Sequence, residues 1–196
     1  MSFRYRSHAR KFLVHILYYL IILGAESLAQ QSDVPVNVQI PLLFKILSYD
    51  RALKANPENK IIIGLAYQGH NKYSRYMKEE IEEYTNANPG HIGTTQIKML
   101  FIDLDQKDLD DFIGGKKIAV LYVAPLRAYD IGGMLSVTQK EKIITVTGVQ
   151  EYVEKGISVG VGLRSDKPVI LINLRSAKAE GADFSSQLLK LAKIIE

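Results

Sequence analysis

Four short apolar runs, each followed by a stretch with helical spacing, constrain the fold of this chain more than any other feature. The runs are Ile61–Tyr67, Ile97–Asp103, Ile118–Val123 and Ile143–Thr147. The first is almost continuously apolar, which is typical of a strand buried on both faces. Four strand–helix units in series predict an α/β fold: one three-layer domain with a mostly parallel sheet flanked by helices.

The helical stretches lie between these runs. The first carries apolar and aromatic residues at helical spacing: Tyr73, Tyr76, Met77, Glu80, Ile81 and Tyr84. A shorter stretch through Phe112 ends at Gly114 and Gly115, because glycine commonly ends helices. Weaker helices are expected over 129–138 and 149–153.

The C-terminal stretch predicts a hairpin and a closing helix. Residues 157–163 alternate between apolar and small side chains, and Arg164–Lys167 forms a turn before a second strand at Pro168. After a polar helical link, one apolar stripe has the spacing of an amphipathic helix: Leu188, Leu191, Ala192 and Ile195. We expect an antiparallel edge and a closing helix, with Leu188, Leu191 and Leu171 in one buried cluster.

This C-terminal pattern resembles the YfiR family of periplasmic proteins. The matching residues are Gly156-Ile157, Ile172-Asn173, the link Ala177–Gly181 and the helix Ser185–Ala192. Residues 36–51, centred on Leu42–Lys45, resemble the family's opening helix. Pro41 would kink or start a helix there, and residues 34–38 also suit a strand. The resemblance favours the helix.

The resemblance implies a non-enzymatic regulator. YfiR-like proteins repress a membrane-bound diguanylate cyclase by binding its periplasmic part, which lowers cyclic-di-GMP signalling and biofilm formation. The implied partner is therefore the periplasmic part of a membrane signalling protein, and a homodimer is the other assembly that this interpretation allows. Relatives use disulfides, whereas this chain has no cysteine, so their redox-regulated behaviour does not carry over.

The N-terminus has the layout of a secretory signal peptide. A basic region with Arg4 and Lys11 precedes the apolar run Phe12–Ala25, and Ser27-Leu28-Ala29 supplies small residues at −3 and −1. The run is short against the roughly 18–20 residues that span a bilayer. We expect cleavage after Ala29, a periplasmic domain over 30–196 and no stable membrane insertion.

Removal of this segment changes the electrostatic argument. Of the formal net charge of +4, four basic residues and Glu26 in segment 1–29 supply +3, which leaves +1. A nearly neutral domain gives no electrostatic reason to expect nucleic acid or an anionic membrane as partner.

No constellation of catalytic residues stands out, and no cofactor is expected. Gly156-Ile157-Ser158-Val159-Gly160 matches the nucleophile-elbow motif, but Ser158 lies inside a predicted strand and no histidine follows His91. His70 and His91 lack co-ligands and are interpreted as loop residues. Among the aspartates at 103–111, Asp103 and Asp105 suit either a hard cation or a helix cap; we favour a cap.

Two candidate sites remain. In parallel sheets, ligands bind beyond the carboxyl ends of the strands. A crevice there would hold a small anionic or amino-acid-like ligand, which is the alternative function; its residues are Gln68, His70, Asn71, Asp103, Asp105, Arg127 and Thr147. The candidate protein interface is Tyr73, Tyr76 and Tyr84, because exposed aromatic groups supply much of the binding energy of interfaces. Their helical spacing also suits core residues.

Overall fold

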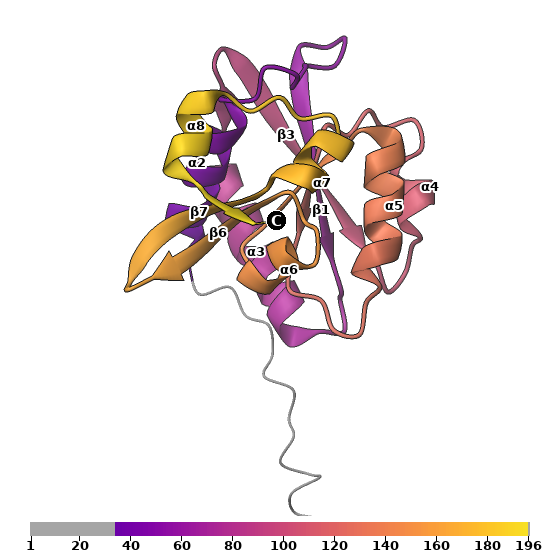
Figure 1. Cartoon of the computed structure of the whole chain (residues 1–196). Coiled ribbons are helices and arrows are strands. Elements are labelled where there is room, and N and C mark those ends of the chain that lie inside the picture. The colour runs from indigo at the N-terminus through magenta and orange to yellow at the C-terminus, as the bar shows by residue number, and fades with distance from the viewer. Residues whose placement is uncertain (1–33, 196) are drawn as a thin grey trace, which may run out of the picture.

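A computed structural model describes residues 34–195 and contains one eight-stranded sheet (Figure 1). The strands follow the spatial order β2-β3-β1-β4-β5-β6-β7-β8. Their bounds are β1 Lys60–Tyr67, β2 His91–Ile92, β3 Thr95–Asp103, β4 Val120–Val123, β5 Ile144–Thr147, β6 Val159–Arg164, β7 Lys167–Asn173 and β8 Lys193–Ile195. The helices are α2 Val36–Leu47, α3 Lys72–Ala87, α4 Leu109–Ile113, α5 Ile131–Glu141, α6 Gln150–Glu154, α7 Leu174–Ala179 and α8 Ser186–Leu191.

The sheet is mostly parallel, which confirms the predicted α/β fold. Strands β3, β1, β4, β5 and β6 run parallel, and each predicted apolar run overlaps one of the first four. The predicted hairpin is β6–β7, in which Gly160 pairs with Leu171. At the other end of the sheet, the two-residue strand β2 pairs antiparallel with β3, which the sequence did not indicate. His91 therefore lies in a strand and not in the expected loop.

The closing helix was predicted wrongly beyond Leu191. Helix α8 ends there, Ala192 adopts an extended backbone, and Lys193–Ile195 forms β8 parallel to β7. Leu191 is 67% exposed, so of the three leucines placed in one cluster, only Leu188 and Leu171 are buried. Strand β8, and not the hairpin, forms this edge of the sheet. The free backbone groups of β7 give the last residues a partner that helical spacing alone cannot reveal.

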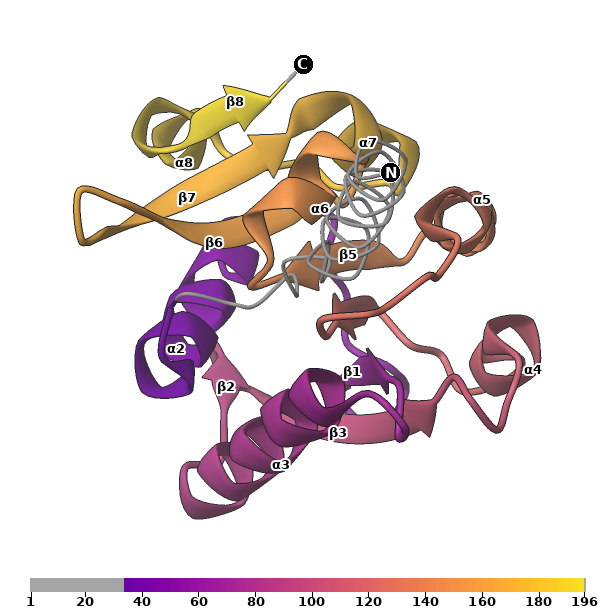
Figure 2. The same cartoon turned by 90° about the horizontal axis from the view of Figure 1, so that it is seen from below.

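The helices form two layers (Figure 2). Helices α2 and α3 cover one face of the sheet, and α4 and α5 lie on the other. The alternation along β1 supports both layers, because Ile61, Ile63 and Leu65 join the core under α2 and α3. Ile62 and Ala66 join the opposite core with residues of α4, α5 and α6.

The opening segment is a helix, as the resemblance indicated, and the alternative strand over 34–38 is wrong. Helix α2 contains Pro41 in its interior and ends at Leu47, before the expected end at 51. Pro41 lies on the exposed side, while Ile40, Leu43 and Leu47 are buried. Burial of this stripe therefore outweighs the loss of one backbone hydrogen bond at the proline.

The glycines of β6 allow α6 to pack closely on the sheet. A Cβ at Gly160 would lie 2.4 Å from Val153 Cγ2, and a Cβ at Gly162 would lie 2.6 Å from Gln150 Oε1. The nearly bare face of the predicted strand is thus a contact surface for a helix. Leu171 packs beside these glycines, on the face opposite Leu188.

Within residues 34–195, no helix is both long and apolar enough to cross a membrane. The expected signal peptide over 1–29 and its cleavage after Ala29 lie outside the described residues.

Candidate functional site

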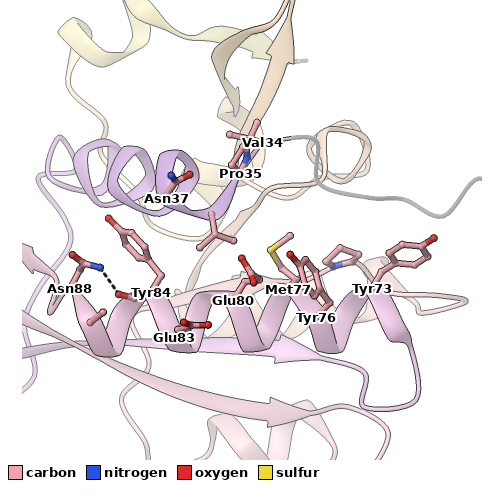
Figure 3. Close-up of a pocket in the computed structure, with 13 residues that line it drawn as sticks. Val34, Pro35, Asn37, Tyr73, Tyr76, Met77, Glu80, Glu83, Tyr84 and Asn88 are labelled. Carbon is pink, nitrogen blue, oxygen red and sulfur yellow. Dashed lines mark hydrogen bonds between the residues drawn. The ribbon is translucent and has the colours of Figure 1, made fainter.

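A groove of about 660 Å³ lies between the start of α2 and one side of α3 (Figure 3). Val34, Pro35 and Asn37 contribute one wall, and Pro125, after β4, also lines it. Val36 of α2 is a further lining residue, and the others come from α3 and its C-cap Asn88: Tyr73, Tyr76, Met77, Glu80, Glu83, Tyr84, Ala87 and Asn88.

The local sequence sets how α3 faces this groove. The Asn71 side chain caps the helix by accepting a hydrogen bond from Tyr73 N at 3.1 Å. Ser74, Met77 and Ile81 are the buried residues of α3. Because the buried stripe turns with the helical period, Tyr76 and Glu80 are left beside it, on the side toward α2.

Buried hydrogen bonds fix the position of the elements that line the groove opposite α3. The Tyr122 hydroxyl on β4 donates to Gln39 Oε1 on α2 at 2.6 Å, and both side chains are buried. The Tyr152 hydroxyl accepts from Leu126 N at 2.7 Å and donates to Leu126 O at 2.9 Å, which fixes the backbone next to Pro125. The groove is therefore built on supported elements on both sides.

The groove combines aromatic rings with carboxylates. Tyr73 is 43% and Tyr76 57% exposed, whereas Tyr84 is half-buried and packs against the core. The structure thus brings the three candidate interface tyrosines to one surface, with Tyr84 also serving the core. The negative charge of Glu80, one turn along α3, raises the pKa of the Tyr76 hydroxyl. Glu80 and Glu83 were not singled out as site residues, although their spacing relative to Tyr76 and Tyr84 places them on the same side.

The candidate crevice residues also meet, but they bond to one another. Asp103 Oδ1 accepts from Gly69 N at 2.9 Å, and Asp105 Oδ2 accepts from His70 N at 2.9 Å. The Gln68 side chain pairs with the Arg127 backbone, at 2.7 Å to its N and 3.2 Å to its O. These polar groups join the loop after β1 to the loops after β3 and β4.

Two further crevice residues, Thr147 and Asn71, already use their side chains in hydrogen bonds within the protein. The Thr147 hydroxyl is buried, donates to Val123 O at 2.8 Å and accepts from Val149 N at 3.1 Å. The Asn71 side chain is engaged in the helix cap and in a 3.4 Å contact with Pro125 O. Of the set, His70, Asp105 and Arg127 are exposed residues, although the Asp105 side chain itself is only 21% exposed.

Asp103 and Asp108 accept hydrogen bonds from backbone N–H groups. The prediction that Asp103 or Asp105 caps the following helix is wrong. Asp108 caps α4 by accepting from Asp110 N at 3.1 Å. Asp103 instead bonds the turn that follows its own strand, at 3.1 Å from Asp105 N. Among the described residues, no group of three or more His, Asp or Glu side chains is arranged to hold a metal ion.

Ser158 lies in a buried polar cluster rather than at a nucleophile elbow. Its hydroxyl donates to Glu180 Oε2, which also accepts from Thr145 N at 2.8 Å. Glu180 Oε1 accepts from the Thr138 and Thr145 hydroxyls, each at 2.9 Å. Desolvation raises the pKa of Glu180, although these hydrogen bonds act in the opposite direction. Glu180, the C-cap residue of α7, was not singled out from the sequence.

Comparison with known proteins gives a family and a fold. The YfiR/HmsC-like family model matches residues 37–193, which confirms the resemblance. No curated protein matches the chain.

Solved structures share the fold at low identity. The ABC domain in complex with L-Trp from Streptococcus pneumonia aligns with a TM-score of 0.55 and 15% identity, covering 83% of this chain and 62% of that one. The substrate-binding protein CD0873 of Clostridium difficile, which has adhesive properties, aligns with a TM-score of 0.53 and 21% identity, covering 83% of this chain and 60% of that one. A conserved domain protein of Vibrio cholerae O1 biovar eltor aligns with a TM-score of 0.57 and 16% identity, covering 83% of this chain and 60% of that one. The chain thus spans about three fifths of each of these structures.

Proposed function

Because this chain belongs to the YfiR/HmsC-like family, we propose that it is a non-enzymatic periplasmic regulator that binds a membrane signalling protein. The resemblance names the periplasmic part of a diguanylate cyclase as the partner. Repression of that enzyme would lower cyclic-di-GMP output and biofilm formation. Export through the N-terminal signal segment, with a mature start at Gln30, is part of the proposal.

The groove between α2 and α3 is the observation that carries this proposal. Two of the five large hydrophobic side chains that are exposed in the described part of the chain, Tyr73 and Tyr76, line it. Aromatic residues that stay exposed beside a concave apolar floor are typical anchors of protein interfaces. The supports at Gln39 and Leu126 keep the walls in place, which lowers the cost of ordering them on binding.

Capture of a membrane protein tests the proposal. We expect the tagged wild-type chain to retain, from a membrane extract of its own cells, a protein that mass spectrometry identifies as a membrane signalling protein. Tyr76→Ala should weaken this capture about tenfold or more, as loss of an interface anchor does. Tyr129→Ala is the matched control, because Tyr129 packs against the opposite core. Equal capture by wild-type and Tyr76→Ala protein would show that the groove is not the interface.

A small-molecule-binding role is the second candidate. The fold is shared with a substrate-binding protein and with a domain solved in complex with L-Trp. The polar groups of the strand-end crevice already bond one another, which makes this role the weaker one. A dose-dependent rise in the Tm of the purified chain on addition of L-Trp would favour it over the regulator.

A further inference from the structure

The charges around the groove are of one sign. Its lining side chains include two carboxylates, Glu80 and Glu83, and no lysine or arginine. Two of the three basic residues on the same helix take other directions: Arg75 bonds Gly69 O at 2.8 Å, and Lys78 pairs with Glu82 and lies over the Phe101 ring. The groove is therefore acidic, although the mature chain carries a small positive charge.

The rings and the carboxylates lie within reach of one another. Figure 3 shows Glu80 between Tyr84 and the Met77–Tyr76 pair, on the side of α3 that faces α2. The negative charge of Glu80 is also the main cause of the raised pKa of the Tyr76 hydroxyl. A cation in this position would meet both the negative face of a ring and a carboxylate.

This combination selects a guanidinium. The planar group of arginine stacks on an aromatic ring and donates two parallel hydrogen bonds to a carboxylate, which an ammonium cannot do. We propose that the groove binds an arginine side chain on a segment of the partner protein, with Glu80 and Glu83 as acceptors and Tyr76 as the stacking ring. The proposal rests on the proposed function, since it describes the partner that the groove recognises.

The dimensions of the groove fit a segment rather than a single residue. It extends along α3 from Tyr73 to Asn88, roughly 22 Å at the rise of an α-helix. Its apolar floor includes Met77, Val36 and Ala87. We expect the arginine to be flanked by apolar residues that contact this floor.

The test uses two probes of nearly equal shape, of which only one carries the charged guanidinium. N-acetyl-arginine amide is titrated into the purified chain, and N-acetyl-citrulline amide serves as the neutral isostere. We expect the arginine probe to shift the NMR ring signals of Tyr76 and Tyr84 in a saturable way, and the citrulline probe to bind about tenfold more weakly or worse. Equal binding of both probes, or no shift by either, would overturn the proposal.

Charge-removing variants locate the acceptors. Glu80→Gln and Glu83→Gln should each weaken the arginine probe severalfold, and the double variant should abolish its saturable shift. Glu79→Gln is the matched control, because Glu79 lies on the same helix but faces Arg75 at 4.0 Å. If Glu79→Gln weakens the probe as much as Glu80→Gln does, the effect is one of net charge and the site is not at Glu80.

The membrane extract separates this inference from the function on which it rests. Loss of capture in both Tyr76→Ala and Glu80→Gln supports both proposals. Loss in Tyr76→Ala with full capture by the Glu80→Gln, Glu83→Gln double variant retains the regulator and rejects the arginine. Failure of the wild-type chain to capture any membrane protein rejects the function, even if the arginine probe binds.

Discussion

The Tyr122 hydroxyl donates a 2.6 Å hydrogen bond to the Gln39 side chain, although the two residues are 83 positions apart. This buried bond joins the centre of the sheet to the helix that forms one wall of the groove. The pKa of Tyr122 is raised, with burial as the main cause, so the hydroxyl remains a donor across the physiological range.

Removal of the Tyr122 hydroxyl should lower the stability of the protein without leaving a cavity in the core. We expect Tyr122→Phe to lower the free energy of unfolding by about 1–3 kcal/mol, because the ring stays in place while a buried acceptor loses its donor. Urea denaturation of both proteins measures the difference. A change below about 0.5 kcal/mol would show that the bond does not hold α2 on the sheet.

Two leucines of one predicted stripe should behave oppositely. Leu188 is 1% exposed and Leu191 67% exposed, so Leu188→Ala should destabilise the chain by about 2–5 kcal/mol and Leu191→Ala by less than about 0.5 kcal/mol. The pair has identical chemistry, which makes each variant the control for the other. Equal losses in urea denaturation would contradict the burial of α8.

Glu180 should make stability depend on pH. Its pKa is raised in the folded protein above the ordinary value of 4.5, so the folded state binds the proton more tightly than the unfolded state does. The stability that this group contributes is fully present below pH 4.5 and is lost as pH rises through the raised pKa.

The variant Glu180→Gln isolates this dependence, because it cannot titrate. The free energy of unfolding of the wild type minus that of the variant should fall as pH rises from 4 toward neutrality. Other titrating groups cancel in the difference. A difference that is flat or grows with pH would be inconsistent with a raised pKa in the folded state.

The sheet and its flanking helices could be predicted from the sequence, but the two edge strands of the sheet could not. The apolar run Ile61–Tyr67 specifies β1 because its residues are buried on both faces, whichever neighbours surround it. Lys193–Ile195 follows a helical stripe and becomes a strand because β7 offers free backbone groups, which is a tertiary effect. The strand His91–Ile92 is too short for any periodicity.

Only the wall of the groove that α3 forms could be predicted from the sequence. Tyr73, Tyr76 and Tyr84 have a spacing that places them on one helix, and the structure keeps the first two exposed. The second wall comes from Val34 and Pro35, at the start of a helix that precedes β1 and is brought alongside by the sheet. The chain order does not show that these two walls meet. Glu180 was missed for the same reason, since its partners lie on α5, β5 and the residues before β6.

Site-specific photocrosslinking in living cells tests the central claim most directly. A photoreactive phenylalanine derivative replaces Tyr76 in one variant and Lys140, which is exposed on α5 over the opposite face, in another. We predict that position 76 gives an adduct with a membrane signalling protein and that position 140 gives none. An adduct from position 140 alone, or none from either position with both variants folded and exported, would contradict partner binding through the groove between α2 and α3.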